Sequence, residues 1–146
     1  MSAEYMHIGI PVTNRKPNMT YNEGAKFWVS NVDDYDYKIE YLKFEEGAPF
    51  PEEIHRNPHV AYKVDDLEKY IDDADRVICG PMTANGKGDR LAFVWKDGAI
   101  LELYQGGCAA ATVNQKKHII KDEQVFFLEY LFVYLLSGRS NCQCLE

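Results

Sequence analysis

The chain is poor in the features that mark several large classes of protein. It has four cysteines, Cys79, Cys108, Cys142 and Cys144, and no C-x-x-C pair. Because zinc sites built on cysteine usually show such pairs, we predict free thiols rather than a metal or disulfide framework. Basic residues are in the minority, with 16 lysines and arginines against 23 acidic side chains. The resulting net charge of -7 repels phosphate backbones, which argues against nucleic acid as a partner.

Long apolar stretches are also missing. The longest is the run 125–136, whose only charged residue is Glu129. It is shorter than the roughly 20 residues that a membrane-spanning helix needs. The first ten residues, MSAEYMHIGI, contain no basic segment followed by an apolar one, so no signal peptide is visible. We therefore expect a cytoplasmic protein with no membrane partner.

The length of 146 residues suits one domain with an appendage. Residues 1–104 carry the whole net charge, whereas residues 105–146 carry four charges of each sign. Two glycines at 106 and 107 make a break at this point. We predict a domain at 1–105 and a C-terminal extension at 106–146. The extension is expected to be helical and to pack, through its apolar run, on the domain or on a partner chain.

The domain has the pattern of short strands separated by turns. We expect strands at residues 5–12, 25–29, 37–44, 59–64, 76–79, 91–95 and 99–104. The last two are joined by Asp97-Gly98, a strong hairpin signal. The polar segment 13–23 and the proline-containing segment 45–58 are expected to be loops, and Gly80-Pro81 to end the strand that precedes it.

One helix is predicted directly after the strand at 59–64. Asp65 and Glu68 have the spacing of a capping box, which marks the start of a helix. Apolar residues then follow at helical spacing and form one face; they are Leu67, Tyr70, Ile71 and Ala74.

The two halves of the domain, at about 5–46 and 57–105, are similar to each other. His7 opens the first half and His59 opens the second. Residues 25–29 align with 91–95, and residues 39–42 align with 101–104, which matches Glu40 to Glu102. Each half therefore begins with a histidine strand and ends with a strand that carries a glutamate. The first half has only a polar loop where the second has its helix and an extra strand.

Three segments in this order, H-I-G-I-P-V, H-V-A-Y-K-V-D-D-L-E-K and G-A-I-L-E-L-Y-Q, carry a resemblance to a known family. The chain resembles the vicinal oxygen chelate superfamily of glyoxalases, bleomycin-resistance proteins and extradiol dioxygenases, over about residues 5–105. The resemblance implies an α+β fold of paired βαβββ modules whose strands form a curled mixed sheet. The first module is shortened, without its helix and one strand, and the apolar C-terminal extension matches nothing in the family.

The resemblance also implies a divalent metal, held between the modules by His7, Glu40, His59 and Glu102. Imidazole and carboxylate ligands suit Zn, Ni, Co, Mn or Fe. If Glu40 does not bind, the other three residues form a two-histidine, one-carboxylate triad that suits Fe(II). Three alternatives stay open. The histidines can be strand residues bonded to backbone, Glu40 can be solvated, and a lysine or solvent can compensate the charge of Glu102.

Three functions follow from these features. In the first, a metal-dependent lyase or isomerase binds the vicinal oxygens of a small carbonyl substrate and stabilises an enediolate, with Glu40 or Glu102 as catalytic base. In the second, a metal-free protein binds or sequesters a small planar molecule. The third is an Fe(II) dioxygenase. Trp28, Phe93 and Trp95 either line the substrate pocket or belong to the core. Because the missing helix leaves one flank of the sheet uncovered, we expect a homodimer or a swapped arrangement.

Overall fold

The computed structural model describes residues 2–84 and 88–106. The strands of the first half are β1 (Ala3–Pro11), β2 (Thr20–Asn22), β3 (Phe27–Val29) and β4 (Ile39–Phe44). Those of the second half are β5 (His59–Val64), β6 (Arg76–Thr83), β7 (Arg90–Lys96) and β8 (Ala99–Gln105). The described helices are short: α1 (Glu52–Arg56), α2 (Leu67–Asp72), and the 3-10 turns η1 (Val32–Asp34) and η2 (Asp36–Lys38). The fold class is α+β, as predicted.

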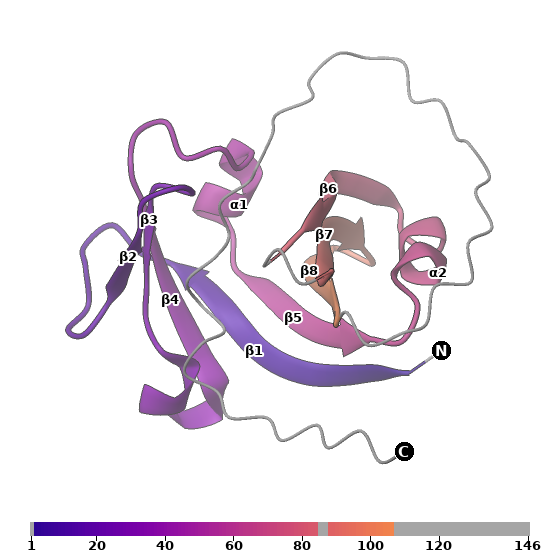
Figure 1. Ribbon diagram of the computed structural model, residues 1–146, viewed down its shortest axis with the longest axis horizontal. Helices are drawn as coiled ribbons and strands as arrows, with labels where there is room; N and C mark the ends of the chain where they lie inside the picture. The colour runs from indigo at the N-terminus through magenta and orange to yellow at the C-terminus, as the bar shows by residue number, and fades with distance from the viewer. Residues whose placement is uncertain (1, 85–87, 107–146) are drawn as a thin grey trace.

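The eight strands of the described ranges form one mixed sheet in the order β2-β3-β4-β1-β5-β8-β7-β6. Figure 1 shows β1 and β5 side by side at the centre, with β2, β3 and β4 on one side and β6, β7 and β8 on the other. Within the described residues the sheet does not close into a barrel, because β2 and β6 lie at opposite ends of this order. The central pair β1 and β5 is antiparallel, whereas each of these strands pairs in parallel with the closing strand of its own half.

The strand pairing repeats between the halves residue by residue. His7 lies opposite Ala61 and Gly9 lies opposite His59, so the two histidine strands meet symmetrically. Gly9 in turn lies beside Glu40 on β4, and Ala61 lies beside Glu102 on β8. Each glutamate is therefore in register with the residue two positions after its own half's histidine, which confirms the predicted match of the two histidine–glutamate pairs.

The predicted alignment of residues 25–29 with residues 91–95 was wrong by four residues. Val29 pairs with Leu42, whereas Leu91 pairs with Tyr104. Because residues 39–42 correspond to 101–104, Val29 corresponds to Leu91 and not to Trp95. An apolar strand pattern repeats every two residues, so it fixes which face a side chain takes but not the register along the strand.

Several expected boundaries also shift. The first half does not lack a strand, because β2 lies within the polar segment 13–23; three residues on a sheet edge carry too little apolar pattern to be recognised. It does lack a helix between β1 and β2, a stretch that the structure describes throughout. The segment 45–58 contains α1, and β6 continues through Gly80-Pro81 to Thr83, at the edge of the sheet where proline is tolerated.

The predicted helix is α2, and it covers the outer face of the second half. Its N-cap is Asp66 rather than Asp65, since the Asp66 side chain accepts a hydrogen bond from the Lys69 backbone N–H. Leu67 is fully buried, in one core cluster with Val94 and Leu103 of the sheet. The remaining predicted members of the apolar face pack against this cluster; they are Tyr70, Ile71 and Ala74.

The predicted hairpin joins β7 to β8 at Asp97 and Gly98, whose φ angles of 49° and 81° both lie in the left-handed region. Two consecutive positive φ angles are what a type I′ turn requires. The C-terminal extension lies outside the described residues apart from Gly106, so its helix remains a prediction. No helix in the described ranges is long and apolar enough to span a membrane.

Candidate metal centre

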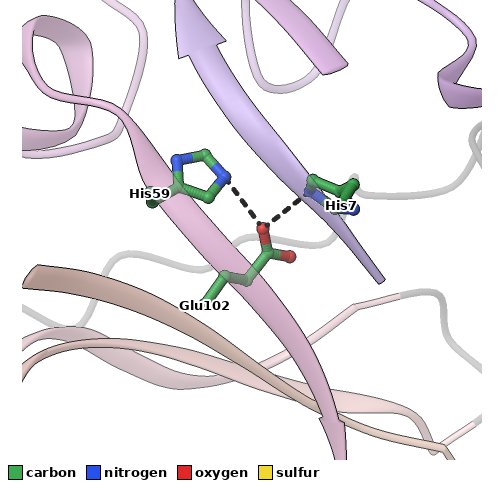
Figure 2. A group of neighbouring side chains, drawn as sticks. All are labelled: His7, His59 and Glu102. Atoms are coloured by element: carbon green, nitrogen blue, oxygen red, sulfur yellow. Dashed lines mark ion pairs between the residues drawn. The ribbon is translucent and has the colours of Figure 1, made fainter. Parts of the chain in front are cut away.

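Two histidines and a glutamate meet at the centre of the sheet. His7 comes from β1, His59 from the first position of β5, and Glu102 from the middle of β8. Figure 2 shows the two imidazoles converging on the Glu102 carboxylate from neighbouring strands. Glu102 Oε2 lies 3.2 Å from His59 Nε2 and 3.5 Å from His7 Nε2. One ligand atom from each residue lies within 4.8 Å of the others, so the three residues can surround a single cation.

Glu40 lies beside this group on β4, the strand that pairs with β1. Its Oε2 lies 3.4 Å from His7 Nε2, and the residue is 6% exposed. It is therefore buried, so the alternative of a solvated Glu40 was wrong. Glu40 lies outside the set of three whose ligand atoms are mutually within 4.8 Å. The structure thus brings all four predicted ligands together, with His7, His59 and Glu102 as the compact core of the site and Glu40 at its margin.

Gly9 makes room for His59. A Cβ atom at position 9 would lie 2.1 Å from His59 Cε1 and 2.2 Å from His59 Nε2. Side-chain atoms do not approach so closely, so the imidazole occupies the space that any larger residue at position 9 would fill. The equivalent position in the other half is Ala61, opposite His7, where a methyl group is accommodated and fully buried. The two imidazoles are therefore held by similar strands but in unequal packing.

Three of the four ring nitrogens of His7 and His59 lack, within the described part of the chain, the hydrogen bonds that a purely structural histidine needs. Among the described residues, His7 Nε2 and both ring nitrogens of His59 are buried without a hydrogen-bond partner. The Glu102 carboxylate approaches both Nε2 atoms at ion-pair distance without hydrogen-bond alignment. Buried polar atoms are normally satisfied, and lone pairs converging on one region from imidazole and carboxylate are the donor set of a divalent transition metal. The residues present therefore fit a metal ion.

The charges of the cluster are strongly coupled. Burial alone would raise the pKa of Glu102, but the imidazoles of His59 and His7 outweigh it and hold this pKa far below its usual range. Burial would lower the pKa of His7, but the neighbouring carboxylates of Glu102 and Glu40 outweigh that effect and raise it. Without a cation, the two carboxylates therefore favour protonation of His7 over that of a free imidazole. A divalent cation would take the place of this proton.

The cluster lies in the wall of a cavity of about 480 Å³ between the two halves of the sheet. This volume falls within the roughly 300–1,000 Å³ that is typical of small-molecule sites. His7, His59, Glu40 and Glu102 all line it. The apolar part of the lining comes from both halves and from the segment around α1; it comprises Met6, Phe27, Val29, Val32, Leu42, Phe44, Phe50, Ile54, Ala84, Leu91 and Phe93.

Of the three aromatic residues predicted for the pocket, Phe93 lines the cavity and the two tryptophans do not. Trp28 lies between Phe27 and Val29, which both face the cavity, so strand alternation turns it to the opposite face. There Trp28 stacks near Tyr21 and lies under Arg15. Trp95 shares the face of Phe93 but sits one step further along β7, packed into the core beyond the cavity. The core interpretation is therefore correct for Trp95. Trp28 is half buried on the face opposite the cavity and belongs to neither core cluster of the described residues, so neither interpretation holds for it.

Sequence reasoning missed one polar pair at the cavity. Tyr104 lines the cavity two residues after Glu102 on β8, and its hydroxyl donates a hydrogen bond to the buried carboxylate of Asp89. Burial, followed by this contact, raises the pKa of Tyr104, so its hydroxyl stays protonated. The i, i+2 spacing from Glu102 indicated that Tyr104 shares the same face, but Asp89 had no pattern that linked it to the site.

Comparison with known proteins supports the fold and no function. No protein-family model matches the chain, and no curated protein matches it. Among solved structures, the crystal structure of hypothetical protein BH1468 from Bacillus halodurans C-125 is similar, with a TM-score of 0.53. The two sequences are 20% identical, and the match covers 76% of this chain and 99% of that one.

Proposed function

We propose that the chain is a glyoxalase-like vicinal oxygen chelate protein that uses a divalent metal ion to act on a small carbonyl substrate as a lyase or isomerase. The single observation that carries the proposal is the repeat of register in the sheet. His7 with Glu40, and His59 with Glu102, occupy matched positions of the two halves. Residues far apart in sequence thus reach one cavity, as the resemblance of the sequence to this superfamily implies.

The metal would be held by His7, His59 and Glu102. A bound divalent cation would supply Lewis-acid polarisation of the substrate's paired oxygens. Because Glu40 lies outside the compact group yet within 3.4 Å of His7, it is the carboxylate best placed to accept a proton from the carbon beside the carbonyl group. The apolar wall of the cavity would keep water away while the proton moves from the substrate carbon to Glu40.

Metal content and proton exchange test the proposal together. The protein is purified without an affinity tag that binds metal, dialysed against Zn²⁺, Ni²⁺, Co²⁺ or Mn²⁺, and its bound metal is measured by elemental analysis. We expect about one ion per chain in the wild type and in Glu40→Gln, and loss of the ion in His59→Ala. Exchange of the proton next to the carbonyl group of a small ketone or 2-oxo acid, followed by NMR in D₂O, should need both the ion and Glu40.

His55→Ala is the matched control. His55 is the other described histidine with a buried, unpartnered ring nitrogen, but it stacks on Phe44 at 4.2 Å and does not line the cavity. Its loss should leave the metal content unchanged. A wild-type protein that takes up none of the four metals removes the proposal.

A second candidate is metal-free binding of a small planar molecule. It is favoured by the close approach of two imidazoles to Glu102, which balances this buried charge without a cation, and by the aromatic part of the cavity wall. The two candidates separate on chelation. Ligand binding that survives removal of metal, in a protein without turnover or proton exchange, would identify a binding protein.

A further inference from the structure

We propose that the substrate carries an aromatic ring next to its chelating oxygens, and that this ring lies against four phenylalanines, Phe27, Phe44, Phe50 and Phe93. We call this set the phenylalanine wall. The inference rests on the proposed function for the oxygen-bearing end of the substrate, and it adds the chemical class of the rest of the molecule.

The phenylalanine wall is continuous. The Phe27 and Phe44 ring centroids are 5.7 Å apart, and the Phe50 centroid lies 5.9 Å from each of them. Phe50 also lies 6.2 Å from Phe93, with its ring plane turned by 82°. The three pairs that include Phe50 have the separations and steep interplanar angles that aromatic rings prefer, with the edge of one ring directed at the face of the next, and the Phe27–Phe44 pair is tilted at 47°. A further aromatic ring can join the same arrangement.

The wall begins at the candidate metal centre. The ring of Phe93 lies 5.2 Å from the imidazole of His59, at 86° to it. A ligand whose oxygens lie at His59 therefore has its next atoms beside Phe93, and beyond that beside Phe50. Since Phe93 pairs directly with Glu102 across β7 and β8, the chelating and aromatic parts of the cavity are fixed by the same strands.

The phenylalanines line the cavity, and Phe44, Phe50 and Phe93 also pack in or against the core cluster beside it. All four line it, and three of them, Phe27, Phe44 and Phe50, are only half buried. They come from three strands and from the loop before α1, so four separate segments contribute one aromatic residue each to the same surface. A cavity of about 480 Å³ is far larger than a three-carbon carbonyl compound needs. The remaining volume, next to the phenylalanines, is lined by aromatic and aliphatic side chains.

A pair of 2-oxo acids isolates the contribution of the ring. Benzoylformate and pyruvate present the same paired oxygens, and they differ by a phenyl group in place of a methyl group. Their dissociation constants are measured by calorimetry in the metal-loaded protein and after chelation. We expect benzoylformate to bind at least about tenfold more tightly than pyruvate in the metal-loaded protein. The preference should persist without metal, because the wall contains no metal ligand.

Substitutions by leucine, which keep the apolar volume, locate the ring. Phe50→Leu and Phe27→Leu should each reduce the preference at least about threefold, with pyruvate affinity and bound metal unchanged. Trp28→Leu is the matched control, since Trp28 is an aromatic neighbour of Phe27 on β3 but does not line the cavity. It should leave the preference unchanged.

The outcomes separate this inference from the proposed function. A protein that binds metal but binds the two acids within twofold of each other overturns the inference and leaves the proposed function standing. A protein that takes up no metal but keeps a preference that Phe50→Leu removes supports the inference alone. Failure to bind benzoylformate at ~10 mM in either state, or a preference that survives both phenylalanine substitutions, overturns it as well.

Discussion

Replacement of Gly9 by alanine is expected to damage the candidate metal centre without touching any proposed ligand. The added Cβ would lie 2.1 Å from the nearest ring atom of His59. Ordinary carbon–carbon contact begins at about 3.5 Å, so the imidazole or the strands must move by roughly 1.4 Å. Metal–nitrogen bonds in such sites are about 2.0–2.1 Å long and tolerate only about 0.2 Å of error. A displacement of this size therefore takes His59 out of coordination.

The expected result is a loss of metal affinity of at least about 100-fold, the upper end of the effect of changing residues that orient metal ligands. Overpacking should also lower the free energy of unfolding by about 1–3 kcal/mol. Affinity is measured by competition of Co²⁺ or Zn²⁺ with a chromophoric chelator, and stability by urea unfolding of the metal-free protein. The double variant Gly9→Ala/His59→Ala should recover most of the stability, because it removes the clashing ring, but none of the affinity.

Gly106→Ala provides the control for loss of glycine itself. A Cβ at position 106 would meet no atom of residues 2–84 and 88–106 closer than 3.9 Å, and the backbone there is not in the left-handed region. This variant should keep wild-type affinity and stability. The reasoning is refuted if Gly9→Ala binds metal within about twofold of the wild type, or if removing the His59 ring does not restore its stability.

Three further predictions test the fold. Leu67→Ala should cost about 2–5 kcal/mol of unfolding free energy, because Leu67 of α2 is fully buried against the sheet. Urea unfolding measures this cost, and a value below about 0.5 kcal/mol, such as we expect for Lys69→Ala at an exposed position of the same helix, would contradict the placement. Burial raises the pKa of the Cys79 thiol from 9.0 to about 12. At pH 8, Cys79 of the folded protein should therefore react with iodoacetamide roughly 1,000-fold more slowly than Cys79 of the protein unfolded in urea, and peptide mapping measures the two rates. The unfolded chain releases this proton near pH 9 and the folded chain near pH 12, so unfolding free energy should fall as pH rises between these values; equal labelling in both states would count against burial. Removal of residues 106–146 should cause aggregation or loss of an oligomer, because the first half has no helix to cover the outer face of its sheet. Tyr41 on that face is only half buried, whereas the equivalent Leu103 of the second half is buried against α2. A soluble truncated protein whose oligomeric state by light scattering is that of the full chain would contradict this.

The meeting of the four candidate ligands was predicted from the sequence by its resemblance to the vicinal oxygen chelate superfamily, together with two local signals that are each repeated. A histidine near the start of a strand and a glutamate in the closing strand occur in both halves. Strand alternation then places each glutamate on the same face as its histidine. Once the halves pair through β1 and β5, the symmetry of the pairing brings His7 and His59 together without any further information.

The parts that failed depend on contacts distant in sequence. The predicted pocket role of Trp28 was wrong because an aromatic side chain in a three-residue strand does not show which face of the strand points to the cavity. The sequence between β2 and β4 also did not reveal how β3 pairs with its neighbours. The phenylalanine wall was missed because Phe44 is the last residue of its strand and Phe50 lies in a proline-containing loop. No periodicity in the sequence links these two positions. Asp89 likewise meets Tyr104 only through the tertiary fold.

The central claim is that His7, His59 and Glu102 form one metal centre, and anomalous diffraction tests it most directly. Crystals of the wild-type protein grown with Co²⁺ or Zn²⁺ should show a single strong anomalous peak within about 2.0–2.2 Å of His7 Nε2, His59 Nε2 and a Glu102 carboxylate oxygen. A map with no peak among these three side chains in crystals soaked at millimolar metal, or with peaks only at surface histidines and carboxylates, would contradict the claim.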